Sequence, residues 1–283
     1  MKKIGIVGAG FVGSAVDFGF NKDVQKFLVD PKLNTSLVDL KKFNPDFIFI
    51  CVPTPMDKNG KQDSSIIKSV LKEISSLFST TLVIVKSTVL PNTIKNLSEL
   101  CPNFVYNPEF LREKTAKEDF INQTTLILGG PANLTKKVSD LYNECTPCKI
   151  SNLLQTDIVA AALAKYTINS FLASKVIFFN QLKNVFDFSE TDESWANFIK
   201  IVSSDNRIGN SHMDVPGHDG RYGFGGACFP KDTSALLNLS DSYDQEFSLL
   251  KEVIKVNNGI RSKYANMEAR EMEQSVSFDF NLD

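Results

Sequence analysis

The stretch Gly8-Ala9-Gly10-Phe11-Val12-Gly13 decides the fold, because it joins an apolar β-rich run to a helical pattern. The run covers residues 3–7 and the helical pattern covers residues 11–21. In such a G-x-G-x-x-G sequence the first glycine permits a tight turn, the second lets backbone approach a pyrophosphate, and the third lets helix and strand pack closely. The N–H groups at the start of the helix favour a phosphate. The stretch therefore predicts a dinucleotide-binding site.

Asp30 indicates which dinucleotide the site binds. It ends the second apolar run, 22 residues after Gly8, where an acidic residue binds the hydroxyls of the adenosine ribose. A carboxylate at that place disfavours a 2′-phosphate, so the sequence predicts NAD rather than NADP. The alternative, a glycine-rich turn near a surface aspartate, is the less favoured interpretation.

The first half of the chain contains six short β-rich runs, at residues 3–7, 26–29, 46–52, 81–86, 104–106 and 124–128. Helix-like or loop segments separate them, at residues 11–21, 36–43, 64–78, 91–100 and 112–122. Apolar strands that do not alternate with polar residues, joined by crossovers of this length, are typical of a parallel sheet covered on both faces. We therefore predict an α/β fold whose first domain, residues 1–152, is a doubly wound parallel-sheet (Rossmann) domain.

The strand signal disappears from about Thr156. Residues 156–185 have the pattern of one long helix that is apolar on most sides, and such a helix must be buried in its domain or against another chain. Further helical patterns cover residues 194–203, 232–239 and 247–258, and the glycine-rich stretch 207–231 is typical of a loop. We predict an all-helical central and dimerisation domain over residues 153–265. A polar tail follows at 266–283, and we expect residues 268–283 to fray.

The composition excludes some partners and compartments. A formal net charge of -2 provides no global attraction to nucleic acid or anionic lipid, so we expect neither partner. The most apolar stretch, residues 158–182, contains Lys165 and Asn169 and is typical of a buried helix rather than a membrane span. The five cysteines are an odd number and predict reduced thiols in a cytoplasm. Cys145 and Cys148 lack a second pair or a nearby histidine, so we expect two loop cysteines and no metal.

Polar or proline-rich clusters follow three of the predicted strands, at residues 51–55, 87–89 and 107–113. Ligands of doubly wound sheets bind beyond the carboxyl ends of the strands, which is where these clusters lie. Each alone could be a turn, but three along one crevice favour a binding site.

Two features of the second half are candidates for chemistry. Lys165 and Asn169 lie four residues apart on one helical face, where a cation and an amide could stabilise an oxyanion, although a lysine in such a helix could equally reach the surface. The stretch 223–232 contains three glycines, Cys228 and Asp232. A nearby lysine or a helix N-terminus could stabilise a Cys228 thiolate. The alternative for Cys228 is a buried structural cysteine.

Taken together, these segments resemble the UDP-glucose / GDP-mannose 6-dehydrogenase family over residues 1 to about 261. The resemblance rests on the glycine motif, the three clusters, residues 164–173 (AKYTINSFLA), residues 207–209 (RIG), residues 223–233 and residues 256–258 (VNN). The family oxidises the C6 hydroxyl of a nucleotide sugar in two NAD-dependent steps, giving a uronate. The resemblance implies UDP-glucose as substrate, with GDP-mannose as the alternative.

The resemblance also implies roles for individual residues. Cys228 would be the nucleophile that captures the aldehyde as a thiohemiacetal and then forms a thioester. Lys165 and Asn169 would hold the oxyanions, Asp232 and Thr88 would position water, and Glu113 would assist thioester hydrolysis. Besides the glycine motif and Asp30, the implied NAD contacts are Val52, Pro53, Thr54 and Thr88. The implied substrate contacts are Glu109, Phe110, Leu111, Arg112, Glu113, Lys165, Asn169, Arg207 and Gly225, with Arg207 reaching across a homodimer.

The sequence departs from the family pattern in two ways. The segment between the second and third strands is short, and a third, nucleotide-binding domain is expected to be lacking. A separate chain would then supply the contacts to the uridine, or the enzyme binds weakly, or activity has been lost and the chain is a dinucleotide-binding partner. A reductase of the β-hydroxyacid dehydrogenase type shares the two-domain plan but needs no cysteine loop.

Overall fold

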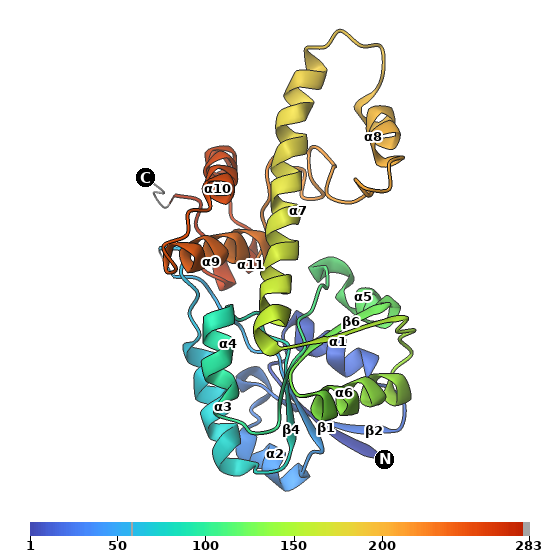
Figure 1. Cartoon of the computed structure of the whole chain (residues 1–283), viewed down its shortest axis with the longest axis vertical. Helices are drawn as coiled ribbons and strands as arrows, with labels where there is room; N and C mark the ends of the chain where they lie inside the picture. Colours follow the sequence, from blue (N-terminus) through green and yellow to red (C-terminus); the bar gives the residue numbers. More distant parts are fainter. Residues whose placement is uncertain (58, 280–283) are drawn as a thin grey trace. The chain divides into compact units, whose positions relative to one another are not determined.

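The computed structural model of the chain describes residues 1–57 and 59–279. The chain forms two compact units (Figure 1). The first unit combines Met1–Thr54 with Asp63–Lys165, and the second combines Pro55–Gln62 with Tyr166–Asp283. Helix α7 (Ile158–Asp187) begins in the first unit and continues in the second.

A seven-stranded sheet forms the centre of the first unit, with the strand order β2-β1-β3-β4-β5-β6-β7. Strands β1 to β5 are parallel, and the order reverses direction at β1, between β2 and β3. Their bounds are Lys2–Val7, Val24–Val29, Phe47–Ile50, Leu82–Val85 and Phe104–Tyr106, followed by β6 (Thr125–Gly129) and β7 (Asn152–Thr156). This order confirms the predicted doubly wound fold, in which ligands bind at the point where the strand order reverses.

The prediction of six parallel strands is wrong in two respects. Strand β6 runs antiparallel to β5, joined to it by the single pair Tyr106↔Gly129, and β7 then pairs with β6 in parallel. Strand β7 was not predicted, because its side chains are mostly exposed and form no apolar run. Helix α6 (Ala132–Cys145) was not predicted either, so Cys145 ends a helix and does not lie in a loop.

Helices cover both faces of this sheet, as Figure 1 shows for α3 and α4 on one side and α1, α5 and α6 on the other. Their bounds are α1 Phe11–Gly19, α2 Leu37–Phe43, α3 Ser65–Leu77, α4 Pro91–Ser98 and α5 Ala116–Asn122. Pro91 occupies the first position of α4, where its missing N–H would have no partner anyway. Ser36 caps α2 in a capping box with Asp39.

Two hydrophobic clusters form the core of the first unit, one on each face of the sheet. Phe20, Phe49, Phe120 and Tyr142 pack ring against ring on the face of α1, α5 and α6. The other face is mostly aliphatic and includes Ala161 and Ala162 from the start of α7. Because β3, β4 and β5 are buried on both faces, their side chains do not alternate between apolar and polar.

The second unit is helical. After α7 it contains α8 (Trp195–Ser203), α9 (Phe229–Asp241), α10 (Ser248–Arg261) and α11 (Ala269–Glu273). This helix was predicted to begin at Asp232, but α9 begins three residues earlier. The preceding loop therefore ends at Cys228. One face of α7 is not buried within this chain, since Phe171 and Phe178 are 70% and 61% exposed, so of the two expected ways of burying the helix only contact with another chain remains for this face.

The expected fraying of the polar tail is wrong for residues 269–276. Helix α11 forms there, and its N-terminus has a capping box between Glu268 and Glu271. Glu271 is 0% exposed and Val276 is also buried. Residues 280–283 of this prediction lie outside the described residues. The segment is ordered by buried polar contacts, which hydrophobic periodicity does not reveal.

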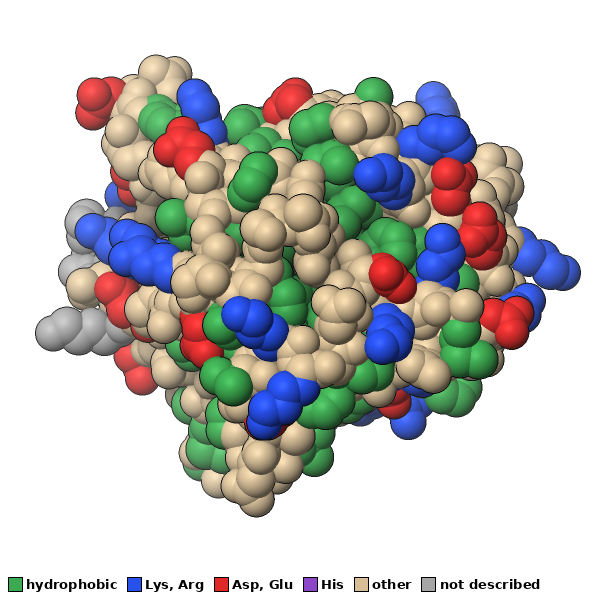
Figure 2. Space-filling view, turned by 90° about the horizontal axis from the view of Figure 1, so that it is seen from below, with side chains coloured by type: hydrophobic (Ala, Val, Ile, Leu, Met, Phe, Trp, Pro, Cys, Tyr) green, Lys and Arg blue, Asp and Glu red, His purple; other side chains and the backbone are tan. Residues whose placement is uncertain are grey.

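The surface shown in Figure 2 has lysine and arginine side chains interspersed with aspartate and glutamate side chains. Among residues 1–57 and 59–279, none of the helices combines the length and hydropathy that a membrane crossing requires.

Candidate active site

The glycine motif follows β1 and has the geometry that a dinucleotide requires. Gly8 has φ +95°, and a Cβ there would lie 2.7 Å from the Cys51 carbonyl oxygen. A Cβ at Gly13 would lie 1.8 Å from the Gly8 carbonyl oxygen, so helix and loop leave no room for a side chain. Gly10 caps α1 and has no other atom within 4 Å of the place of a Cβ. The open space at Gly10, at the N-terminus of α1, fits a pyrophosphate, so these residues fit NAD.

Asp30 lies just after β2 and contacts the same loop. Its Oδ2 accepts a hydrogen bond from the Ala9 N–H at 2.7 Å, and its Oδ1 accepts one from the Lys32 N–H at 2.8 Å. The carboxylate is therefore held beside the glycine motif, at the end of the second strand, by backbone donors. A ribose hydroxyl that binds there shares or replaces one of these bonds.

The loops after β3 and β4 are joined to each other. Ser87 Oγ donates to the Val52 carbonyl oxygen at 2.7 Å, and Thr54 Oγ1 donates to the Thr88 carbonyl oxygen at 2.8 Å. Val52 and Thr54 are buried, whereas Pro53 between them is exposed. The structure thus brings the predicted cofactor residues of the two loops together at the carboxyl ends of adjacent strands.

The 107–113 loop after β5 contains a buried ion pair. Lys165 Nζ donates to the Glu109 carbonyl oxygen at 2.6 Å and to Glu109 Oε1 at 3.2 Å, and it lies 5.0 Å from the centre of the Phe110 ring. Glu109 Oε2 accepts from the Leu111 N–H at 2.6 Å. The interpretation of Lys165 as a surface lysine is therefore wrong, because it is 2% exposed and paired.

Arg112 and Glu113 end this loop on the surface. Arg112 forms an ion pair with Asp119 of α5 at 2.6 Å, and its backbone N–H also donates to Asp119. The Asp119 contact raises the pKa of Arg112. The structure thus uses Arg112 to anchor the loop to α5, while Glu113 is exposed.

A second buried lysine in the first unit was not predicted. Lys86 follows β4 and donates to three neutral acceptors, which are the carbonyl oxygen and Oδ1 of Asn107 at 3.4 and 3.0 Å and the Tyr142 hydroxyl at 3.4 Å. Burial lowers the pKa of Lys86 to about 8, although the nearby Cys51 and Glu109 act in the opposite direction. Lys86 thus fixes the residue at which the 107–113 loop starts.

In the second unit, Cys228 occupies the N-cap position of α9, a helix of 13 residues. The helix N-terminus carries a partial positive charge, which favours a thiolate. One turn later, the fully buried Asp232 accepts a hydrogen bond from Asn169 Nδ2 at 2.6 Å and pairs with Lys231. The structure therefore brings Asn169 and Asp232 together beside the start of the helix that Cys228 caps.

The other four cysteines are buried, whereas Cys228 is only partly buried. Burial raises the pKa of Cys51 to about 12 and that of Cys101 to about 11. Burial also raises the pKa of Cys145. Thiols with raised pKa values are poor nucleophiles at neutral pH. Accessibility and helix position therefore favour Cys228 as the reactive thiol.

The remaining predicted residues of the second unit have different surroundings. Arg207 is exposed and forms a bidentate pair with Asp205, two residues earlier. Gly225 packs against Arg261, and a Cβ there would lie 2.0 Å from Arg261 Nη2. We call residues 223–228 the cysteine loop.

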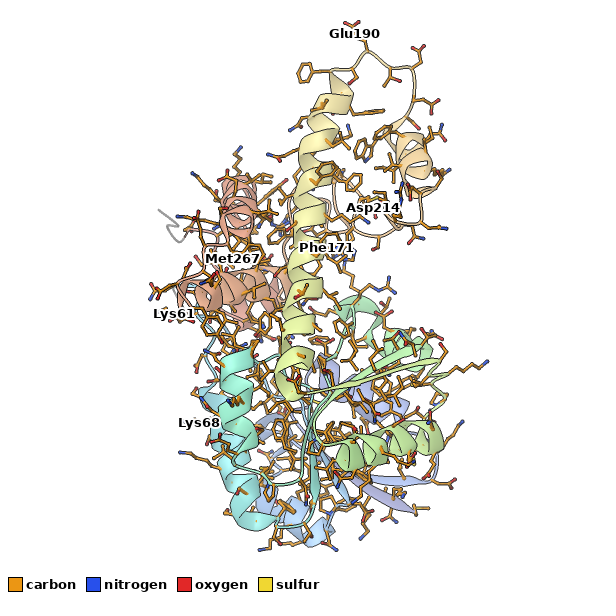
Figure 3. All side chains as sticks on the ribbon, in the orientation of Figure 1. Lys61, Lys68, Phe171, Glu190, Asp214 and Met267 are labelled. Atoms are coloured by element: carbon orange, nitrogen blue, oxygen red, sulfur yellow. The ribbon has the colours of Figure 1, made fainter. Side chains whose placement is uncertain are left out.

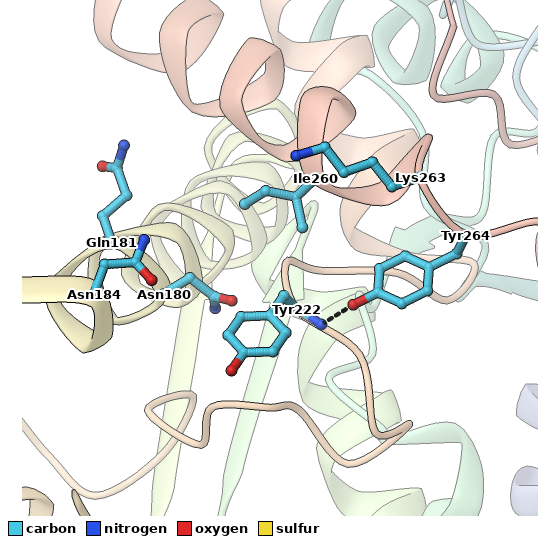
Figure 4. A pocket seen from close by; sticks show the side chains of 7 residues that line it. All are labelled: Asn180, Gln181, Asn184, Tyr222, Ile260, Lys263 and Tyr264. Atoms are coloured by element: carbon cyan, nitrogen blue, oxygen red, sulfur yellow. Dashed lines mark hydrogen bonds between the residues drawn. The ribbon is translucent and has the colours of Figure 1, made fainter. Parts of the chain in front are cut away.

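A cavity of about 260 Å³ lies next to the start of the cysteine loop (Figure 4). Asn180 Oδ1 accepts a hydrogen bond from the Gly223 N–H, and Tyr264 Oη accepts one from the Tyr222 N–H at 3.0 Å. The lining residues are Asn180, Gln181, Asn184, Tyr222, Ile260, Lys263 and Tyr264. The cavity is below the roughly 300 Å³ at which ligand pockets begin, so we assign no ligand to it.

Two family models match the chain. The NAD binding domain of the UDP-glucose/GDP-mannose dehydrogenase family matches residues 18–146, and the central domain of the same family matches residues 159–259. A UDP-glucose 6-dehydrogenase of Campylobacter jejuni is 31% identical over an alignment that covers 97% of this chain and 76% of the relative. The chain belongs to the UDP-glucose/GDP-mannose dehydrogenase family.

Other members of the family are similar over most of this chain. The UDP-glucose 6-dehydrogenase TuaD of Bacillus subtilis is 30% identical over 91% of the chain, which spans 63% of the length of TuaD. The structure of a UDP-glucose dehydrogenase from Pyrobaculum islandicum is similar with a TM-score of 0.74 at 26% identity, over 92% of this chain and 68% of that one. Family membership also distinguishes the chain from β-hydroxyacid dehydrogenases, which share only the plan of the fold.

The structural roles of Lys86, Arg261 and Glu271 were not predicted from the sequence. Arg261 had a signal, because the buried positions of α10 are Leu250, Val253, Ile254, Asn257 and Arg261, a helical spacing that places the arginine on the buried face. Lys86 had a weaker sequence signal of burial, since it directly follows four buried apolar residues. Glu271 had no such signal, because it lies in a mostly charged stretch, residues 268–273, with no apolar period.

Proposed function

We propose that this chain is an NAD-dependent UDP-glucose 6-dehydrogenase, which converts the C6 hydroxyl to a carboxylate through a thioester on Cys228. The position of Cys228 supports this proposal most directly. It is partly accessible, it caps α9, and the Asn169–Asp232 pair lies one helical turn away. A covalent intermediate explains how one site oxidises an alcohol to an acid without releasing the aldehyde.

The reaction balances with two hydride transfers. Bound NAD⁺ supplies the hydride acceptor, once for each oxidation. Cys228 attacks the aldehyde carbon, so that a C–S bond forms and the carbonyl oxygen becomes an oxyanion. Loss of the second hydride turns this thiohemiacetal into a thioester, and water then breaks the C–S bond to give the carboxylate and the thiol. Thr88 and Asp232 are proposed to position water for proton transfer, and Glu113 to assist the hydrolysis.

Lys165 and Asn169 are proposed to stabilise the oxyanion. They lie one turn apart on α7, and each is oriented by a carboxylate, Lys165 by Glu109 and Asn169 by Asp232. Donors that are held in place before the reaction stabilise developing charge without reorganisation. Glu109 thus orients the ammonium and is itself proposed to contact substrate.

UDP-glucose is the proposed substrate because the similar curated relatives from Campylobacter jejuni and Bacillus subtilis are UDP-glucose 6-dehydrogenases. The residues after Cys228, Phe229-Pro230-Lys231-Asp232, resemble the glucose and mannose branch of the family. GDP-mannose is therefore the outcome against which UDP-glucose is tested. Substrate contacts are proposed for residues 109–113, Arg207 and Gly225.

We further propose that the protein is a homodimer formed along α7. Ile168, Phe171, Phe178 and Val185 are exposed and lie within an arc of about 100° on this helix. Figure 3 labels Phe171 on α7. An apolar stripe of this length is typical of a surface that a second copy covers, and a two-fold axis would place the same stripe on both sides.

The proposal is tested by counting NADH. The purified protein is incubated with NAD⁺ and, in separate reactions, with UDP-glucose, GDP-mannose and other nucleotide sugars. We expect two NADH per UDP-glucose. In Cys228→Ser we expect at most about one, formed slowly, because an alkoxide replaces a thiolate poorly.

Cys101→Ser is the matched control. Cys101 is buried, and burial raises the pKa of its thiol to about 11, so this thiol is not expected to act as a nucleophile. It should keep the two-NADH stoichiometry. Normal stoichiometry and rate in Cys228→Ser would contradict the covalent mechanism, and two NADH from GDP-mannose alone would reassign the substrate.

A further inference from the structure

A buried carboxylate connects α11 to the backbone of the cysteine loop. Glu271 Oε1 accepts hydrogen bonds from the Gly226 N–H at 2.9 Å and from Arg261 Nη2 at 3.0 Å. Glu271 Oε2 accepts one from the Glu268 N–H at 2.8 Å. The side chain of Glu271 therefore joins α10 and α11 to the loop, two residues before Cys228.

Arg261 provides the positive charge for this contact. Its Nη1 donates to Asp219 Oδ2 at 2.7 Å, and its guanidinium lies 5.7 and 5.6 Å from the ring centres of Tyr264 and Phe278. Burial raises the pKa of Asp219, but hydrogen bonds from Arg261 and from the Arg221 N–H outweigh it, so the net shift is downward. Two carboxylates thus share one buried guanidinium, an arrangement that is costly unless backbone N–H groups complete it.

The cysteine loop packs directly on this ion pair. A Cβ at Gly225 would lie 2.0 Å from Arg261 Nη2 and 2.6 Å from Glu271 Oε1. Gly226 has φ +73°, which lets its N–H turn toward the carboxylate. The pair therefore determines the backbone conformation of residues 225–226, which precede Ala227 and Cys228.

Glu271 is itself held by its own segment. The capping box at the start of α11 orients its side chain, and the Val276 N–H donates to its carbonyl oxygen at 2.9 Å. The Met56 N–H donates to the Gln274 carbonyl oxygen at 3.1 Å. The carboxylate thus reaches the loop from a fixed position.

We propose that Glu271 is a positioning residue for Cys228, which it holds at the N-cap of α9 through the Gly226 N–H and Arg261. The proposal rests on the proposed function only in that the thiol is the nucleophile. Without the carboxylate, the Gly226 N–H loses its acceptor and Arg261 loses one of its two partners. The loop then samples other conformations, so the steps that need the thiol slow down while binding of NAD⁺ does not change.

The test compares Glu271→Ala with Glu273→Ala, a control at an exposed position of the same helix. Hydrogen exchange is followed in peptides that contain the Gly226 amide, and steady-state kinetics are measured with UDP-glucose. In Glu271→Ala we expect exchange at least tenfold faster and kcat at least tenfold lower, with KM for NAD⁺ within twofold of the parent. Glu271→Gln keeps an acceptor for Gly226 and should restore more than half of kcat.

Unchanged exchange in Glu271→Ala, or faster exchange with an unchanged kcat, would overturn the proposal. Should Glu271→Ala not fold, Glu271→Asp replaces it, since the shorter side chain cannot reach the loop and the same changes are expected. If the parent protein forms no NADH with any nucleotide sugar, the proposed function is wrong, but the positioning role of Glu271 is still open to test. The positioning role is then judged by alkylation of Cys228 with iodoacetamide. A rate at least fivefold slower in Glu271→Ala supports it, because a thiol displaced from the N-cap loses the stabilisation of its thiolate, and an equal or faster rate overturns it.

Discussion

Replacing Lys86 with methionine should change how the stability of the protein depends on pH. Methionine has a similar length and no charge, so the substitution removes the buried ammonium. Tyr142 and Asn107 keep the 2.8 Å hydrogen bond between the tyrosine hydroxyl and the Asn107 Oδ1. The Tyr142 hydroxyl and the Asn107 side chain therefore keep a partner.

The expected magnitude follows from the pKa of Lys86. Burial lowers it from the usual 10.5 to about 8. Because the folded-state pKa lies below the unfolded one, the penalty on the folded state is complete below pH 8 and disappears as the pH rises from 8 to 10.5. A difference of 2.5 pKa units corresponds to about 3.4 kcal/mol, of which about 1.3 kcal/mol is regained between pH 7 and pH 9.

The assay is urea unfolding at pH 7 and pH 9, followed by circular dichroism, for the parent, Lys86→Met and Lys137→Met. Lys137 is an exposed lysine of α6 and serves as the control. The parent and the control should gain about 1.3 kcal/mol relative to Lys86→Met when the pH rises from 7 to 9. Equal changes in all three proteins would refute the reasoning, because Lys86 would then titrate alike in the folded and unfolded states.

Three further predictions concern the cofactor and the dimer. Because Asp30 disfavours a 2′-phosphate, NAD⁺ should bind at least about tenfold (1.4 kcal/mol) more tightly than NADP⁺ in a calorimetric titration; equal affinity would remove this role. Phe171→Glu should give a monomer by light scattering at micromolar concentration where the parent is a dimer, whereas a monomeric parent would contradict the α7 interface. Gly13→Ala should destabilise the protein by about 2–3 kcal/mol or more in thermal unfolding, since the added Cβ meets the Gly8 carbonyl oxygen. Gly10→Ala should fold normally, because its Cβ would meet no other atom, but it should bind NAD⁺ more weakly in a titration.

The parts of the fold that the sequence predicted are those encoded locally. Strands β3 to β5 are runs of apolar residues, and α3 and α10 repeat apolar residues with a helical period. Helix α6 also had the period, with buried residues at Leu134, Val138, Leu141, Tyr142 and Cys145, and was overlooked. The direction of β6 could not be predicted, because a strand's own side chains do not determine whether its neighbour is parallel.

The sequence indicated candidate residues for the chemistry but not the residues that they pair with. Spacing placed Lys165 and Asn169 on one helix face, but the acids that orient them lie 56 and 63 residues away along the chain. Such pairs form only when the fold brings distant segments together. Asp219 and Glu271 belong to the same class, because their partner Arg261 lies 42 and 10 residues away.

The junction between β5 and β6 depends on a side chain. Elsewhere in the sheet, neighbouring strands share at least three backbone pairs, which almost any residue can form. Across this junction the ladder has one pair, and Asn107 Nδ2 adds a hydrogen bond to the Ile127 carbonyl oxygen at 3.0 Å. The continuity of the sheet is thus sensitive to the identity of a single residue. Because the same asparagine begins the 107–113 loop, a change that loosened the loop there would also separate two strands from the other five.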